Sequence, residues 1–205
     1  RIMNILLMST AYNLYWLGRY MRRTQELPAR VLECGSQQRN ELLRYLGWPL
    51  EPGGDDLDLL KRYLNETAMP QLFESINDNV QVVRGVIDGD AAELFNQVKR
   101  LNQADSRRAA RFQLHACSAA MLQQSGDVTR FWQLGDYVEM LDTRIRLGSA
   151  QSRHYRYLAD VVTSLPANTG WDRIKQQSQA LVYTTDKRQF YGWHERLTQL
   201  FEEGV

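Results

Sequence analysis

The sequence of 205 residues lacks the features that mark several large classes of protein. Its only cysteines are Cys34 and Cys117, which cannot form a disulfide framework, so a reducing, cytoplasmic location is the simpler expectation. No apolar run is long enough to cross a bilayer, and the apolar residues 2–8 lack the cleavage pattern of a secretory signal. We therefore expect no membrane-spanning helix. Because the chain opens on Arg1 rather than on Met, we expect a trimmed or engineered start.

An excess of charge of either sign is also missing. Lys and Arg together number 25 and Asp and Glu 24, a net charge of +1, which argues against nucleic acid or an anionic membrane as a partner. Lysine is scarce, so most of the basic residues are arginines. Arginine makes planar, directional pairs with carboxylates, phosphates and aromatic faces, so we expect many of these side chains to have fixed partners. An arginine-rich genome would give the same bias.

Motifs for common chemistries are absent from the sequence. There is no G-x-S-x-G, no P-loop and no G-x-G-x-x-G, which argues against nucleophilic catalysis and nucleotide binding by those routes. His115 and Cys117 are two residues apart on a predicted helix and so point to different faces, and His154 and His194 lie in no ligand spacing. We expect no metal site, no cofactor, and structural or surface roles for the histidines.

Nearly every periodic stretch predicts a helix. In the first, apolar residues recur three and four apart from Leu14 to Leu27, and Ser9 or Thr10 can cap it. Pro28 should kink or locally loosen this helix without necessarily ending it. Further helices are expected over about 36–46, 56–65, 70–88, 91–102, 106–124, 128–149, 150–164, 171–183 and 186–203. No alternating β-branched run competes. The prediction is an all-α, multi-helix bundle: one domain over residues 1–205, with a loop from Gly47 to Asp56.

One short phrase occurs twice in the chain. Residues 13–25 read NLYWLGRYMRRTQ, and residues 130–142 read RFWQLGDYVEMLD. Placing Gly18 on Gly135 gives a constant offset of 117 and brings the apolar positions of the two stretches into register. This indicates an internal duplication of a long helix. The alternative is a core pattern shared without common descent.

Both copies carry a glycine and a cluster of charge. A glycine inside a helix costs roughly 1 kcal/mol relative to alanine, so Gly18 and Gly135 indicate close approach of another helix or a ligand. Duplicated helices tend to face one another across a pseudo-twofold axis. We therefore expect the two helices to abut, with partly buried pairs between Arg19, Arg22 and Arg23 of the first copy and Asp136, Glu139 and Asp142 of the second. The alternative is that both clusters lie on solvated faces.

The two windows resemble the bacterial alpha-E family. Its first phrase, L-Y-W-hydrophobic-G/A-R-Y-hydrophobic-E-R-A-E, is similar to Leu14-Tyr15-Trp16-Leu17-Gly18-Arg19-Tyr20. Its later phrase, G-R-hydrophobic-hydrophobic-E-R-A-D, is matched by Gly135, Glu139 and Asp142. This chain departs from the first pattern at two acids, replaced by Arg22 and Gln25, and from the second at two arginines, replaced by Asp136 and Met140. It resembles a shortened or divergent member.

The resemblance implies a function. Alpha-E proteins are typically encoded beside circularly permuted ATP-grasp ligases and transglutaminase-like proteins, which implies a role in forming or tailoring peptide or amide bonds. Because the acids of the first phrase are replaced, we predict an accessory or scaffold protein that binds the ligase or its peptide substrate, with a transglutaminase-like protein as a second partner. The alternatives are an enzyme in which Arg19 grips a carboxylate and Glu139 and Asp142 handle protons, and a structural bundle that forms a homodimer. The candidate site comprises Tyr15, Trp16, Gly18, Arg19, Arg22, Arg23, Gly135, Asp136, Glu139 and Asp142.

Overall fold

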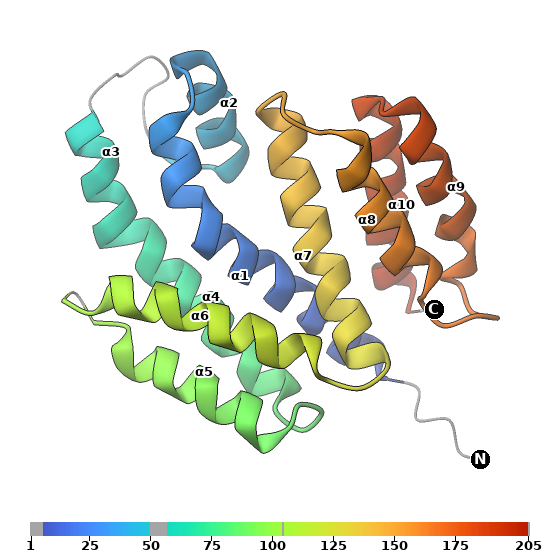
Figure 1. Cartoon of the computed structure of the whole chain (residues 1–205), viewed down its shortest axis with the longest axis horizontal. Helices are drawn as coiled ribbons and strands as arrows, with labels where there is room; N and C mark the ends of the chain where they lie inside the picture. The colour runs from blue at the N-terminus through green and yellow to red at the C-terminus, as the bar shows by residue number, and fades with distance from the viewer. Residues whose placement is uncertain (1–5, 50–56, 104, 205) are drawn as a thin grey trace.

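The computed structural model describes residues 6–49, 57–103 and 105–204, and over these ranges the chain is helical without any strand (Figure 1). The predicted all-α class is confirmed. In chain order the helices are α1 (Met8–Glu33), α2 (Ser36–Leu46), α3 (Leu57–Tyr63), the π-helical segment η1 (Leu64–Ala68), α4 (Met69–Val83), α5 (Gly89–Leu101), α6 (Arg107–Leu122), α7 (Asp127–Arg146), α8 (Ser152–Thr163), α9 (Asp172–Thr184) and α10 (Lys187–Glu203).

Several predicted helix ends are wrong by a few residues. α1 begins at Met8, before either predicted cap, and its N-cap Leu7 makes no side-chain bond. α4 ends at Val83 rather than near 88, because the Asp88 carboxylate caps the next helix by accepting from the Ala91 N–H at 2.7 Å. α7 ends at Arg146. Most of the predicted loop from Gly47 to Asp56, namely residues 50–56, lies outside the described residues.

The predicted break before Pro70 is replaced by a π-helical turn. α3, η1 and α4 follow one another without a gap, and the Met69 N–H bonds to the Leu64 carbonyl, five residues back. A proline ring in a regular helix clashes with the carbonyl four residues earlier, and a wider turn relieves that clash. The segment therefore keeps its direction through Pro70, which occupies the first turn of α4.

α1 and α7 form the centre of the bundle. They make the most extensive contact between any two helices of the described chain. α3 to α6 lie on one side of this pair and α8 to α10 on the other (Figure 1). α1 also packs against α4, α5 against α6, and α8 against α7 and α9. Residues that were two separate phrases in the sequence thus lie at the middle of the fold.

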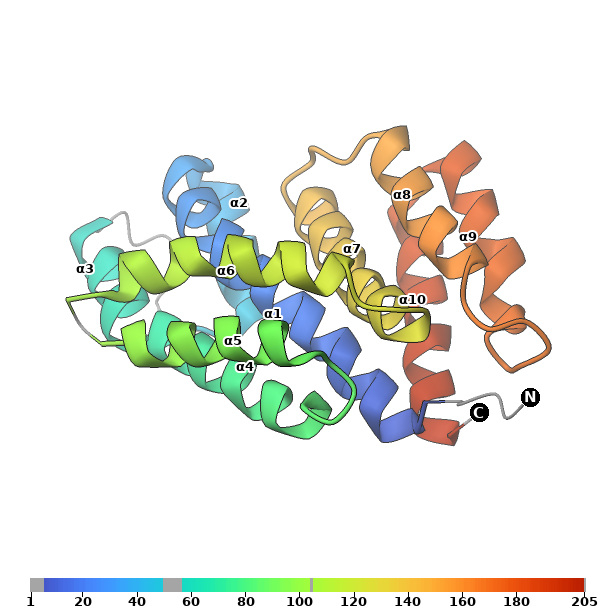
Figure 2. The same cartoon turned by 60° about the horizontal axis from the view of Figure 1, so that its bottom comes forward.

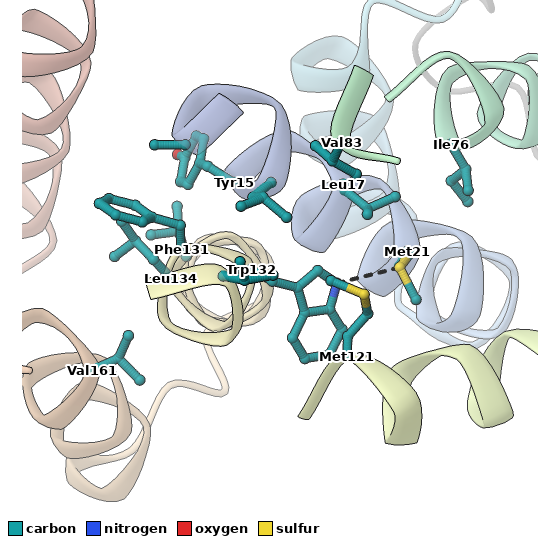
Figure 3. Packing of buried hydrophobic residues seen from close by; sticks show 14 of the residues in the cluster. Tyr15, Leu17, Met21, Ile76, Val83, Met121, Phe131, Trp132, Leu134 and Val161 are labelled. Carbon is teal, nitrogen blue, oxygen red and sulfur yellow. Dashed lines mark hydrogen bonds between the residues drawn. The ribbon is translucent and has the colours of Figure 1, made fainter. Parts of the chain in front are cut away.

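The core has a large and a small part. The large part includes Leu17, Met21 and Trp132, whose indole Nε1 donates to the Met21 Sδ at 3.3 Å (Figure 3). A smaller cluster joins the second half of α1 to α2 and α3. An apolar stripe of the last helix docks on the large core; its residues are Phe190, Trp193, Leu197 and Leu200. Among the described helices none is both long and apolar enough to cross a membrane.

Candidate functional site

α1 and α7 touch backbone to backbone at their two glycines. A Cβ atom added to Gly18 would overlap the Trp132 carbonyl and lie 2.8 Å from the Asp136 N. A Cβ atom added to Gly135 would overlap the Tyr15 carbonyl and lie 3.1 Å from the Arg19 N. Distances this short exclude any side chain, so the predicted close approach at both glycines is confirmed.

The contacts at this crossing are reciprocal. The offset of 117 carries Tyr15 onto Trp132 and Arg19 onto Asp136. Gly18 therefore touches the equivalents of the residues that touch Gly135. Such an exchange of contacts is what a twofold axis between two copies of one helix produces, and it accords with a duplicated unit.

Glu139 lies between two arginines at the crossing. The Arg19 Nε donates to the Glu139 Oε2 at 2.9 Å, and the Arg23 Nε donates to its Oε1 at 2.6 Å. Arg19 is 3% exposed and Glu139 2%, so this is a buried group of charges. Burial alone would raise the pKa of Glu139, but Arg23 and Arg19 outweigh it and lower the pKa to about 2. Glu139 is thus a firmly held carboxylate.

A second ion pair mirrors the first. The Arg22 Nε and Nη2 donate to the two oxygens of Asp136 at 2.7 and 2.9 Å, and Nη1 donates to Glu26 at 2.7 Å. Under the offset of 117, Arg22 corresponds to Glu139 and Arg19 to Asp136, so the two bridges are equivalent with opposite polarity. The predicted pairing of the clusters is confirmed, and the interpretation as two solvated faces is wrong, because the aligned helices bury the charges against one another.

The third carboxylate, Asp142, has partners on four helices, one of which is its own helix α7. Tyr45 of α2 donates its hydroxyl to Oδ2 at 2.6 Å, Tyr191 of α10 donates to Oδ1 at 2.9 Å, and the Arg146 Nε donates to Oδ1 at 3.1 Å. The Arg19 Nη2 lies 3.6 Å from Oδ2. Tyr45, Arg146 and Tyr191 were not predicted, because the doubled phrase contains none of them.

The far end of Arg19 is enclosed by aromatic rings. Its guanidinium lies 4.7 Å from the centre of the Trp16 ring, and Nη1 donates to the Tyr15 hydroxyl at 3.2 Å. The His194 Nε2 lies 3.3 Å from that hydroxyl and 3.4 Å from Nη1. α10 therefore brings His194 into the charged centre, a position that its place in the sequence did not predict, and the contacts it makes there are those of a structural residue.

The protonation states at the centre are set by burial and by Arg19. Burial and Arg19 together lower the pKa of His194 to about 4, so its ring is neutral near pH 7. Burial raises the pKa of Tyr15, and it raises the pKa of Tyr45 to about 12 although Arg19 opposes it. Both phenols are therefore protonated donors. The arrangement holds charges in place and keeps neighbouring groups neutral.

A small cavity opens beside the charged centre. Its volume is about 230 Å³, and Arg23 lies in its wall together with Tyr20, Trp48 and Tyr63. The Trp48 and Tyr63 rings are 5.0 Å apart, and the Arg23 guanidinium lies 5.7 Å from the Tyr20 ring centre. Among the described residues, no group of three or more His, Cys, Asp or Glu side chains is placed to hold a metal ion. The cavity offers a cation and aromatic faces.

All ten predicted site residues are brought together at or beside the crossing. Two departures from the family pattern lie outside the network: Gln25 donates to Ser118 of α6 at 3.2 Å, and Met140 is buried. Fold and site together define an all-α bundle built around the pair of helices α1 and α7.

The family model for Alpha-E, a predicted alpha-helical domain with a conserved ER motif, matches residues 6–198. The chain belongs to the Alpha-E family. Neither a curated protein nor a solved structure matches it. At the positions where the resemblance places Glu-Arg, the first copy keeps only Arg23 and the second only Glu139, and these two side chains bond to each other.

Proposed function

We propose that this chain is a non-catalytic accessory protein of the bacterial cytoplasm that binds a peptide or amide ligase of the ATP-grasp class, or the peptide substrate of such a ligase. The partner follows from the resemblance to alpha-E proteins. The charged centre and the cavity beside it support the mode of action that we propose, which is binding without catalysis.

The observation that carries the proposal is that Glu139 has no oxygen left to exchange a proton with a substrate. Both of its oxygens accept from arginines, it is 2% exposed, and its pKa is held at about 2. A general acid or base works best when its pKa lies near the working pH. Both oxygens of Asp142 also accept hydrogen bonds. The enzyme interpretation, which needs these two acids to move protons, therefore loses support.

The cavity beside the crossing supports binding of a peptide. Arg23 directs Nε and Nη2 to Glu139, and within the described residues its Nη1 has no recorded hydrogen bond. An arginine that shares the cavity wall with Tyr20, Trp48 and Tyr63 suits a peptide end, because the carboxylate pairs with the cation and an apolar side chain packs on the rings. The cavity is small, about 230 Å³, so only the terminal residue of such a peptide fits.

Purified chain mixed with a purified circularly permuted ATP-grasp ligase tests this function. Size-exclusion chromatography with light scattering should show a stable complex, and the chain should raise ligase-dependent product formation. Gln71→Trp should weaken the effect, because Gln71 is an exposed residue of the cavity wall. Gln176→Trp, an exposed change on α9, is the matched control and should have no effect.

Two outcomes would contradict the proposal. A chain that neither binds the ligase nor changes its product, but elutes as a homodimer, is the self-associating bundle. A Glu139→Gln variant that stays folded and keeps the complex, yet stops product formation, favours the enzyme.

A further inference from the structure

A second groove lies away from the crossing. It is formed by the C-terminal half of α1, the junction of α3 with η1, and the start of α6, which lies beside α3 in Figure 2. Its volume is about 320 Å³, within the range of small-molecule sites. It shares no lining residue with the cavity beside Arg23. Its walls are Pro28, Leu32, Lys61, Leu64, Asn65, Met69, Arg107, Arg108 and Arg111.

The groove has four cations and no acid in its lining. Within the described residues, no ion pair is recorded for any of the four, whereas the arginines of the crossing are all paired. Arg107 is held by one bond, from Nη1 to the carbonyl of Asn65 in η1, and its buried Nε has no partner. The groove therefore has unused donors and uncompensated positive charge.

The position of these arginines is unfavourable for the helix that carries them. Arg107, Arg108 and Arg111 lie at the start of α6, which has no acid in its first turn. The N-terminus of a helix carries a partial positive charge, so cations there destabilise it. Arg111 is also three and four residues from the other two, a spacing at which like charges repel. A bound anion would remove all of these costs together.

We propose that this groove binds a compact polyanion, with phosphate groups as the ligand chemistry that fits best. Arginine forks pair in a bidentate manner with phosphate or carboxylate, and free N–H groups at a helix start add donors for an anion. Four cations match a ligand of several charges, which one phosphoester or pyrophosphate group supplies in a small volume. Pro28, Leu32, Leu64 and Met69 form an apolar wall for the rest of the molecule. This site is independent of the proposed ligase partnership.

Calorimetric titration of the full chain with inorganic pyrophosphate, at low salt to limit screening, tests the proposal. Binding should be saturable. The double variant Arg108→Glu/Arg111→Glu should raise the Kd for pyrophosphate by roughly a hundredfold, since hydrogen bonds to charged groups are each worth about a factor of ten. Arg62→Glu is the matched control: it reverses an exposed arginine of α3 that does not line the groove, and it should change the Kd by less than about threefold.

Thermal unfolding without ligand separates lost binding from lost folding. Arg108→Glu places an acid in the first turn of α6, so this variant should melt about 1–3 °C higher than the parent while it binds pyrophosphate more weakly. Citrate titrated in parallel distinguishes the sources of charge: tighter binding of citrate than of pyrophosphate keeps the polyanion site and assigns it to carboxylates. No saturable heat with either ligand up to about 10 mM, or binding unaffected by the charge reversal, would overturn the site.

Discussion

The crossing and the groove each carry three arginines within five residues of one helix. Arg19, Arg22 and Arg23 lie in the middle of α1, and each bonds an acid of α7. Arg107, Arg108 and Arg111 lie at the start of α6 and line an open groove without a recorded ion pair among the described residues. The residue type and the local spacing are nearly the same. The difference teaches that the opposing surface, and not the cluster itself, decides whether arginines stabilise a fold or remain available to a ligand.

The largest difference should appear when one charge is removed from each region. Glu139→Gln should lower the free energy of unfolding by about 3–5 kcal/mol, because Arg19 and Arg23 then keep buried charges without their main counter-ion. Arg108→Gln in the groove should change it by less than about 0.5 kcal/mol. Urea unfolding measures both. Equal losses in the two variants would remove the distinction between the regions.

Filling the glycine contact should cost nearly as much. Gly135→Ala should destabilise the chain by about 3 kcal/mol or more, because the new Cβ overlaps the Tyr15 carbonyl and the helices must separate. Gly192→Ala is the control: this glycine also lies inside a helix, but its Cβ position is open, so alanine should stabilise by up to about 1 kcal/mol. A Gly135→Ala variant with the same melting temperature as the parent would contradict the close approach of the two helices.

Lowering the pH should reduce the stability that the crossing contributes and leave the charges of the groove unchanged. The folded pKa of His194 is about 4, below its ordinary value of 6.5, so the unfolded chain binds the extra proton first. Stability is therefore full above pH 6.5 and falls by on the order of 3 kcal/mol as the pH drops to 4. Below about pH 4.5, the unfolded chain takes up a proton at Glu139 while the folded chain, in which the pKa of this group is about 2, does not, so stability falls further. The variant His194→Gln should flatten the first part of this pH profile in urea titrations. An unchanged profile would place the titration elsewhere.

The smallest effect concerns the polarity of the second bridge. Arg22→Glu alone should cost about 1–2 kcal/mol, because it sets a carboxylate against Asp136 and Glu26 on a partly exposed surface. The double variant Arg22→Glu/Asp136→Arg should recover most of this loss, since it reverses the pair and returns to the pattern of the family phrase. A double variant no better than the single one in a double-mutant cycle would show that the two residues do not couple.

Much of the centre could be predicted, since both of its helices carry the same phrase. The phrase fixes which residues of α1 and α7 align, and the charge difference between the copies predicts the pairs. Tyr45, Tyr191 and His194 could not be found in this way, because they lie on α2 and α10 and reach the centre only through long-range packing. No local sequence pattern predicts such long-range packing.

Helix ends were predicted less well for a related reason. The early end of α4 depends on which of several acids near Gly89 caps the next helix, and Asp88 does so. The π-helical turn depends on how the chain relieves the clash at Pro70, for which a break or a wider turn are both local solutions. In each place the sequence permits two structures, and packing selects one.

The Arg19–Glu139 and Arg22–Asp136 ion pairs have opposite polarity, which affects how two incompletely folded chains can pair. If two chains exchanged central helices, α1 of one chain against α1 of another would oppose Arg19 to Arg22 in both directions, and α7 against α7 would oppose Asp136 to Glu139. Only an unlike pairing leaves every charge neutralised. The charges of α1 and α7 are thus complementary, so each of these helices pairs favourably with the other and unfavourably with a second copy of itself.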